Sequence, residues 1–266
     1  MRIPSLDSGT EQGRTERSTL SGEARDAMRI GRGNGPVFLG DWREMVFLHY
    51  EVDADALQEA IPFPLDLHEG KAYVSLVAFT MLRFRPAFGG RWTRWLTAGM
   101  KTQRFLNVRT YVRGARGRGI FFQHEWLDHP LAVRLGPATF GLPYRRGSLS
   151  YQTHPNGVSG TVVVTSGNHT GLFRGQFIGP ERMAAPGSLE EFLVERYTAY
   201  TAAGFRPLAF RVWHEPWTLR TIRMEDETME TVWQTLRQPW TESLRFVGAT
   251  YSEGVHDVWM GRPRFA

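Results

Sequence analysis

Residues 105–127 read FLNVRTYVRGARGRGIFFQHEWL, and this stretch decides the fold. Its two ends, residues 105–113 and 119–127, are rich in β-branched and aromatic side chains, which favour extended strands. The connection between them, residues 114–118, is short and contains Gly114 and Gly117, which permit a tight reversal of the chain. The stretch therefore predicts an antiparallel β-hairpin.

The same pattern continues on both sides of the hairpin. Apolar runs alternate with short breaks that contain glycine or proline, whereas parallel pairing would need crossovers of about a dozen residues. Further strands are expected at residues 44–52, 65–68, 72–84, 144–153, 158–166, 172–178, 208–214, 217–223, 244–251 and 254–260. Short helices are expected from the Asp53 cap to Ala60, from the Ser188 cap through Tyr197, and over residues 227–236. The chain is thus predicted to be an α+β protein dominated by an antiparallel sheet.

Residues 1–36 differ in composition from the rest of the chain. They are rich in Ser, Thr, Gly, Arg and Glu and lack hydrophobic periodicity, so they cannot bury enough apolar surface to offset the entropy of ordering. We expect a disordered tail here. Residues 37–266 are expected to form a single domain, because no linker or internal repeat divides them.

Composition excludes several classes of protein. The absence of cysteine rules out disulfides, thiolate nucleophiles and cysteine-ligated metals. There is neither a secretory signal nor an apolar run of about 20 residues, so we expect a cytoplasmic protein without a membrane span. The formal charge of +5 is compatible with nucleic-acid binding, but the basic residues are scattered rather than clustered. Nucleic acid is therefore an unfavoured partner, confined to the basic tail.

The first strand of the hairpin has one polar face. Alternation places Asn107, Arg109 and Tyr111 together on that face. Inside a closed sheet, the planar guanidinium of Arg109 would suit a carboxylate or a phosphate. On a solvent-facing strand the same arginine would have no specific role, and alternation alone does not separate the two interpretations.

The second strand of the hairpin carries a carboxyl group. Gln123 and Glu125 are expected on one face of this strand, with Phe122 on the other. Glu125 could pair with Arg109 across the hairpin, or act as a general acid or base in a pocket.

No cofactor and no metal site are predicted. His124 and His129 lack the His-Glu-x-x-His spacing of zinc proteases and would point to opposite faces of a strand. The 9 tryptophans and 17 phenylalanines come without any nucleotide, flavin or haem motif. Most of these rings are expected in the core, although some could line an apolar cavity.

Several sequence blocks resemble a known family. They are NVRTYV at 107–112, FGLPYR at 140–145, HEPW at 214–217, GKAYV at 70–74 and the segment 52–62. In this order and spacing they resemble the YqjF-like family of uncharacterised bacterial proteins, over about residues 38–260. That family is grouped by fold with acetoacetate decarboxylase. The resemblance therefore implies a closed antiparallel β-sheet, a cone or barrel, with a pocket for a small acid inside.

The chain departs from the decarboxylase at the position of its reactive lysine. There a Gly-x-Pro-Lys-Lys segment supplies the amine that forms a Schiff base, whereas Tyr144 and Arg145 follow Pro143 in this chain. Neither a phenol nor a guanidinium can form an imine. Schiff-base chemistry is therefore expected to be absent, with Lys71 and Lys101 at the surface.

Together these features predict a protein that binds a small organic acid in an internal pocket. The expected ligand-binding residues are Asn107, Arg109, Tyr111 and Arg145. Tyr144 and Glu125 are the candidates for proton transfer, should the protein be a lyase or an isomerase. A non-catalytic sensor, or a scaffold whose barrel is filled by side chains, is the alternative, and the sequence leaves the ligand and the oligomeric state open.

Overall fold

The computed structural model describes residues 35–89, 102–164, 169–203 and 206–266. The strands are β1 (Pro36–Val52), β2 (Ala72–Pro86), β3 (Thr102–Gly114), β4 (Gly117–Leu127), β5 (Tyr144–His154), β6 (Gly157–Val164), β7 (His169–Met183), β8 (Thr198–Ala203), β9 (Arg206–Trp213), β10 (Thr218–Thr228), β11 (Arg245–Gly261) and β12 (Arg264–Phe265). The helices are α2 (Ala54–Ala60), α3 (Pro130–Phe140), α4 (Leu189–Val194), α5 (Glu230–Leu236) and the 3-10 helix η3 (Pro239–Ser243).

The strands form one 12-stranded sheet in the order β12-β9-β8-β4-β3-β2-β1-β11-β10-β7-β6-β5. β4 pairs in parallel with β5 and with β8, and the other paired strands are antiparallel. The predicted hairpin is present as β3 and β4. The α+β class and the dominance of antiparallel pairing are therefore confirmed.

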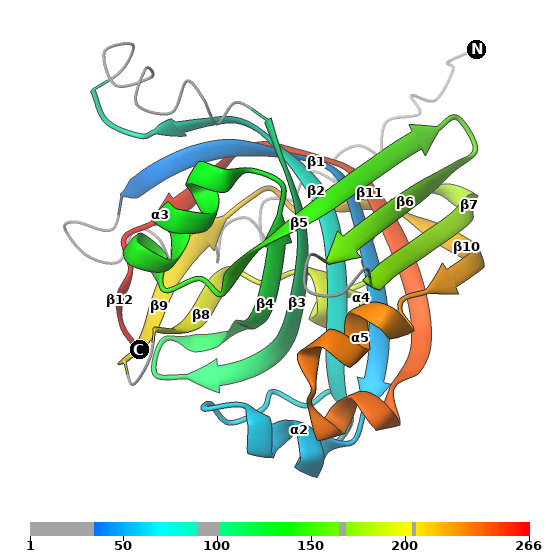
Figure 1. Cartoon of the computed structure of the whole chain (residues 1–266), viewed down its shortest axis with the longest axis horizontal. Coiled ribbons are helices and arrows are strands. Elements are labelled where there is room, and N and C mark those ends of the chain that lie inside the picture. The colour runs from blue at the N-terminus through cyan, green and yellow to red at the C-terminus, as the bar shows by residue number, and fades with distance from the viewer. Residues whose placement is uncertain (1–34, 90–101, 165–168, 204–205) are drawn as a thin grey trace, which may run out of the picture.

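Two branch points close the sheet on itself. β4 pairs with β5 through residues 125–127 and with β8 through residues 120–121. β11 likewise pairs with β10 through residues 249–251 and with β9 through residues 259–260. Two rings of strands result, and both contain β4, β3, β2, β1 and β11 as a shared wall. The first ring is completed by β10, β7, β6 and β5, and the second ring by β9 and β8, on the opposite side of this wall (Figure 1).

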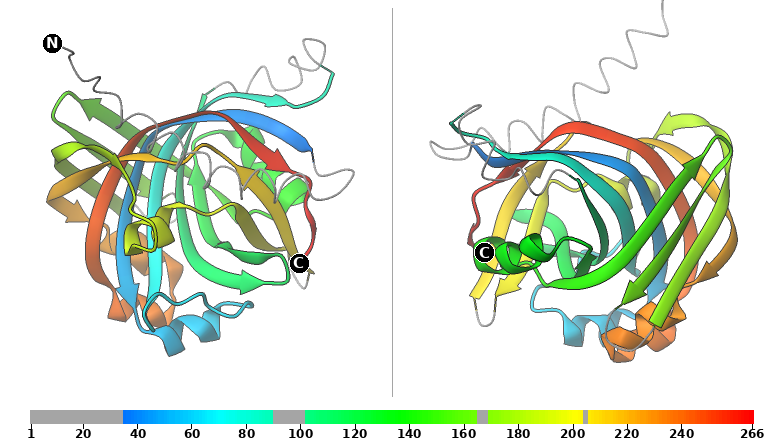
Figure 2. Two further views of the ribbon diagram at one scale, coloured as in Figure 1. Left: turned by 180° about the vertical axis from the view of Figure 1, so that it is seen from behind. Right: turned by 45° about the horizontal axis from the view of Figure 1, so that its top comes forward.

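The two faces of the shared wall belong to two hydrophobic cores. Leu48 of β1 packs in the first core, which also contains Val162 of β6 and Phe173 of β7. Its neighbour Phe47 packs in the second core, with Phe210 of β9. Because successive side chains of a strand point to opposite faces, each shared strand supplies both cores. The curvature that closes the rings is visible in both views of Figure 2.

The structure differs from the sequence prediction at β11, which is one strand rather than two. Gly254 was expected to begin a second strand, but β11 runs through it. Its φ is +106°, and a Cβ atom at this position would lie 1.9 Å from the carbonyl oxygen of Trp42. The glycine therefore marks a close approach to β1 within a continuous strand, not a turn.

The helices also differ from the sequence prediction in three places. α3 was not predicted, although Pro130 in its first turn and the left-handed Gly141 at its C-cap are typical helix boundaries. The helix expected through Tyr197 ends at Val194, and Thr198 begins β8 instead. α5 starts at Glu230 because residues up to Thr228 extend β10. The short strand expected at residues 65–68 is reduced to isolated bridges.

Part of the chain lies outside the described residues. This holds for residues 1–34 of the expected tail and for Lys101, whereas Pro36 already belongs to β1. The single domain expected over residues 37–266 stays a prediction. In the described ranges, no helix combines the length and the apolar character that a membrane span requires.

Candidate functional site

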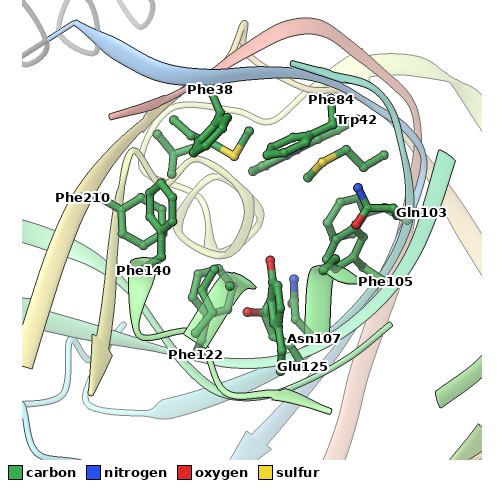
Figure 3. A pocket seen from close by; sticks show the side chains of 18 of the residues that line it. Phe38, Trp42, Phe84, Gln103, Phe105, Asn107, Phe122, Glu125, Phe140 and Phe210 are labelled. Atoms are coloured by element: carbon green, nitrogen blue, oxygen red, sulfur yellow. The ribbon is translucent and has the colours of Figure 1, made fainter. Parts of the chain in front are cut away.

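The second ring encloses a cavity of about 310 Å³. Aromatic rings from β1, β2, β3, β4, β5, β9 and α3 form most of its wall, as Figure 3 shows for many of them. These rings belong to Phe38, Trp42, Phe79, Phe84, Phe105, Phe122, Phe140, Tyr144 and Phe210. A cavity with this lining favours a ligand with an apolar body.

Helix α3 lies between the cavity and the outside of the protein. Ala132 and Phe140 are buried in the lining, whereas Leu135 also lines the cavity but is 43% exposed. Gly136 packs against the ring of Tyr144 so closely that a Cβ atom there would lie 2.2 Å from the Cε2 atom of the tyrosine. The missing side chain at position 136 is what allows α3 and β5 to meet.

Three polar side chains stand side by side across β3, β4 and β5. Asn107 is the pairing partner of Glu125 in the antiparallel ladder, and Glu125 is the partner of Tyr144 in the parallel one. All three line the cavity, and Figure 3 shows Asn107 and Glu125 next to each other in its wall. We call these three residues the polar row. Gln103, further along β3, lines the cavity as well.

A bulge in the hairpin decides which residues of β4 face the cavity. Val108 pairs with His124 but Arg109 pairs with Phe122, so Gln123 is the extra residue on β4. As a result Phe122 and Glu125 both line the cavity. The expectation that Gln123 shares a face with Glu125 and that Phe122 lies opposite was wrong, because simple alternation does not allow for the extra residue.

Glu125 is a buried carboxyl group whose surroundings favour the protonated form. The residue is 3% exposed, and its Oε2 atom has no hydrogen-bond partner. Burial raises the pKa of Glu125 well above its ordinary value, since a carboxylate loses its hydration in an apolar cavity. Burial and, secondarily, Glu125 raise the pKa of Tyr144 as well. Burial therefore favours the uncharged forms of Glu125 and Tyr144 in the polar row.

Arg109 is a buried cation without a direct ion pair among the described residues, although the charge of Glu195 acts on it. The residue is 6% exposed and lines the cavity, and it takes part in none of the ion pairs found among the described residues. Its Nη2 donates to the carbonyl oxygen of Leu193 at 3.0 Å, and its Nε has no partner. Burial lowers the pKa of Arg109, but a guanidinium keeps its proton in proteins. The cavity thus contains one positive charge.

A buried hydrogen-bonded chain holds the acceptor of Arg109 in place. The hydroxyl of Tyr111 also donates to the carbonyl oxygen of Leu193, at 2.9 Å, and lies 2.6 Å from the hydroxyl of Ser75. That hydroxyl in turn lies 2.7 Å from the Nδ1 of His49. Burial lowers the pKa of His49 to about 3, with a smaller contribution from the charge of Arg109, so the imidazole is neutral. Tyr111 does not line the cavity. It helps to fix the position of Arg109, because both side chains donate to the same carbonyl oxygen of Leu193.

The other residues singled out from the sequence lie elsewhere. Arg145 is exposed and outside the cavity lining, because it follows Tyr144 on β5 and so points to the other face of the sheet. There its charge, after burial, helps to lower the pKa of His124 to about 4. Lys71 is exposed and pairs with Glu51 at 3.1 Å. Within the described ranges, no group of three or more histidine, aspartate or glutamate side chains is placed to hold a metal ion.

The sequence did not identify α3, the bulge at Gln123 or the aromatic wall. The proline and glycine at the two ends of α3 were the available signal for the helix. No local signal announces which of the many aromatic side chains face a cavity, because that depends on how distant strands close the ring.

The fold of this chain is shared by several solved structures. The chain superposes on acetoacetate decarboxylase from Legionella pneumophila with a TM-score of 0.60 and 13% sequence identity, over 87% of each chain. It superposes on the enduracididine biosynthesis enzyme MppR complexed with pyruvate with a TM-score of 0.57 and 13% identity, over 86% of this chain and 90% of that chain. The fold is therefore acetoacetate decarboxylase-like, as the sequence resemblance implied.

The family follows from the sequence. Residues 40–256 match the model of the DUF2071 family, described as an uncharacterized conserved protein, and the chain belongs to this family. It is 27% identical over 190 residues to the uncharacterized protein YqjF of Bacillus subtilis (strain 168), which covers 69% of this chain and 75% of that protein. The predicted relationship to the YqjF-like proteins is confirmed.

Proposed function

We propose that the cavity of the second ring binds a small carboxylic acid with an apolar body, and that Arg109 holds its carboxylate. The observation that carries this proposal is the state of Arg109, a buried guanidinium in the cavity wall with an unpartnered Nε and no ion-pair partner among the described residues. A buried charge that no counter-ion contacts directly is costly, and planar guanidinium donors match a carboxylate. A bound acid would supply both the negative charge and the missing acceptor.

The rest of the lining supports an apolar body for the ligand. The wall is mainly aromatic, and a volume of about 310 Å³ lies at the small end of ligand-binding cavities. Because burial favours the protonated form of Glu125, Arg109 is the charged group that a ligand would meet in the lining. This charge favours a monoanion. A protein of the same fold, MppR, has been captured with pyruvate, which is itself a small carboxylate.

Thermal unfolding in the presence of 3-phenylpropanoate tests the proposal. At a concentration about 100 times the Kd, the acid should stabilise the native protein by about 2.7 kcal/mol and raise its Tm by roughly 5–10 °C. The variant Arg109→Met should show no shift. Arg145→Met, a matched loss of an arginine outside the cavity, should respond like the wild type. Equal shifts in the wild type and Arg109→Met, or no shift with any small monocarboxylate, would contradict the proposal.

Turnover is a separate proposal. Glu125 and Tyr144 line the cavity, and a protonated carboxyl group can act as a general acid in a lyase or isomerase step that needs no Schiff base. A non-catalytic sensor would use the same cavity and the same anchor. The cavity in the second ring favours both of these over a scaffold with a filled interior. Nucleic-acid binding by the tail concerns residues outside the described part of the chain.

A further inference from the structure

The polar row contains buried side-chain atoms without a hydrogen-bond partner in the described part of the chain. Asn107 and Glu125 are 4% and 3% exposed, and Asn107 Oδ1 and Glu125 Oε2 are both without a partner. No hydrogen bond of the Tyr144 hydroxyl is found within the described ranges either. Two neighbouring strands thus present buried, unpartnered oxygen atoms of Asn107 and Glu125 to the cavity, and the half-buried Tyr144 on the next strand lines the same cavity.

Such a cluster is unusual in a folded protein. Buried polar side chains nearly always have a partner, and an unpaired one destabilises the native state. Apolar side chains at these three positions would complete the aromatic wall and remove that cost. The polar groups are therefore explained best by a ligand whose own polar group forms the missing hydrogen bonds.

We propose that Asn107, Glu125 and Tyr144 form a second subsite of the cavity, which recognises an uncharged hydroxyl or carboxamide group on the ligand. A neutral carboxyl group, a side-chain amide and a phenol each offer both a donor and an acceptor. A hydroxyl or carboxamide also donates and accepts, so it can pair with such a row. A second carboxylate would meet Glu125 without a cation beside it.

This subsite deepens the proposed function and rests on it, because it assumes that Arg109 holds the acid group. Arg109 lies two residues beyond Asn107 on the same face of β3, so the charged and uncharged subsites share one cavity. The ligand class is then a small hydroxy acid or acid amide with an apolar body between its two polar ends.

Calorimetric titration of the wild-type protein tests the subsite with a matched series of acids. The parent is 3-phenylpropanoate, and the others carry a hydroxyl or a carboxylate at the ortho, meta or para position of the ring. At least one hydroxyl isomer should bind about tenfold more tightly than the parent, as expected for one good buried hydrogen bond. The carboxylate at the same ring position should bind more weakly than the parent.

Two substitutions at Glu125 separate recognition from packing. Glu125→Gln keeps an uncharged donor and acceptor and should retain the gain from the hydroxyl group. Glu125→Leu should lose that gain and bind the parent acid at least as well as the wild type, and it should fold because it removes an unpaired polar group. Asn107→Leu is a second, independent variant with the same expectation. Arg145→Met should leave all affinities unchanged.

The outcomes distinguish the subsite from the proposed function. If no acid of the series binds, the proposed function and the subsite both fail. If the parent binds but no hydroxyl isomer gains affinity, the subsite alone is overturned. A gain that persists in both Glu125→Leu and Asn107→Leu overturns it as well, because the hydroxyl would then be recognised elsewhere.

Discussion

Gly136 of α3 lies directly against the aromatic ring of Tyr144 on β5, and a Cβ atom at position 136 would lie 2.2 Å from the Cε2 of the tyrosine. Side-chain contacts are never this short, so any larger residue at position 136 would displace the ring or the helix. Tyr144 is part of the cavity wall. Gly136 therefore helps to set the shape of the cavity, because it fixes how closely α3 packs against Tyr144 in the cavity wall.

The substitution Gly136→Ala tests this relationship. Alanine is the better helix former by about 1 kcal/mol, but the clash should outweigh this gain and destabilise the protein by about 1–3 kcal/mol. Displacement of Tyr144 should also weaken binding of 3-phenylpropanoate. Urea unfolding and calorimetric titration measure the two effects. Leu131→Ala, at an exposed position of the same helix, is the control, and an alanine at 136 that raises stability with unchanged affinity would show that the contact is unimportant.

Arg109 and Arg196 should respond in opposite directions to replacement by methionine. Arg196 pairs with the buried Asp66 at 2.8 Å, so Arg196→Met should lower the free energy of unfolding by about 2 kcal/mol or more. Arg109 has no direct ion pair, and Glu195 acts on it only as a minor electrostatic contribution, so Arg109→Met should leave stability unchanged or raise it by about 1–3 kcal/mol. Urea denaturation of the two variants checks the prediction. A large loss of stability in Arg109→Met would mean that the arginine is structural.

Stability should fall as the pH rises through neutrality because of Glu195. Burial raises the pKa of Glu195 to about 7, although the hydrogen bonds from Tyr197 and Trp217 lower it. The unfolded chain ionises near 4.5, so the native protein holds the proton more tightly. The resulting stabilisation is complete below about pH 4.5 and is lost as the pH rises to about 7, with a total of about 3 kcal/mol.

The variant Glu195→Gln isolates this contribution. Glutamine resembles the protonated acid, so the wild type and the variant should be equally stable near pH 4.5, and the wild type should be less stable by about 3 kcal/mol at pH 8. Thermal or urea unfolding at several pH values measures the difference. A constant difference between the two proteins over this range would rule out a titration of Glu195.

Schiff-base trapping should fail. Tyr144 and Arg145 occupy the segment in which the decarboxylase carries its lysines, and the described cavity lining contains no lysine. Incubation with acetoacetate or pyruvate and borohydride should therefore leave the mass of the protein unchanged. A reduced adduct on Lys71 or Lys101 would overturn this prediction.

The sequence predicts those parts of the site that depend on local pattern. Alternation along 105–113 places Asn107 and Arg109 on one face of β3, and both line the cavity, whereas Tyr144 became a candidate only through the family resemblance. The misplaced residues depend on geometry that alternation does not encode. One extra residue, Gln123, brings Phe122 and Glu125 to the same face of β4, and Glu125 pairs with Asn107 rather than with Arg109.

The closure of the two rings of strands could not be predicted from local sequence patterns either. β4 and β11 each pair with two different strands at their two ends, and these pairings join segments that are far apart in the chain. Only the family resemblance indicated a closed sheet. Whether a strand face borders a cavity, a core or solvent follows from this closure, which is why the sequence left the surroundings of Arg109 undecided.

A crystal structure of the protein with bound 3-phenylpropanoate tests the central claim most directly. The account predicts a carboxylate oxygen within about 3 Å of the Nε of Arg109, with the phenyl ring among the aromatic side chains of the second ring. A carboxylate that points away from Arg109, or a ligand bound outside this cavity, would contradict it.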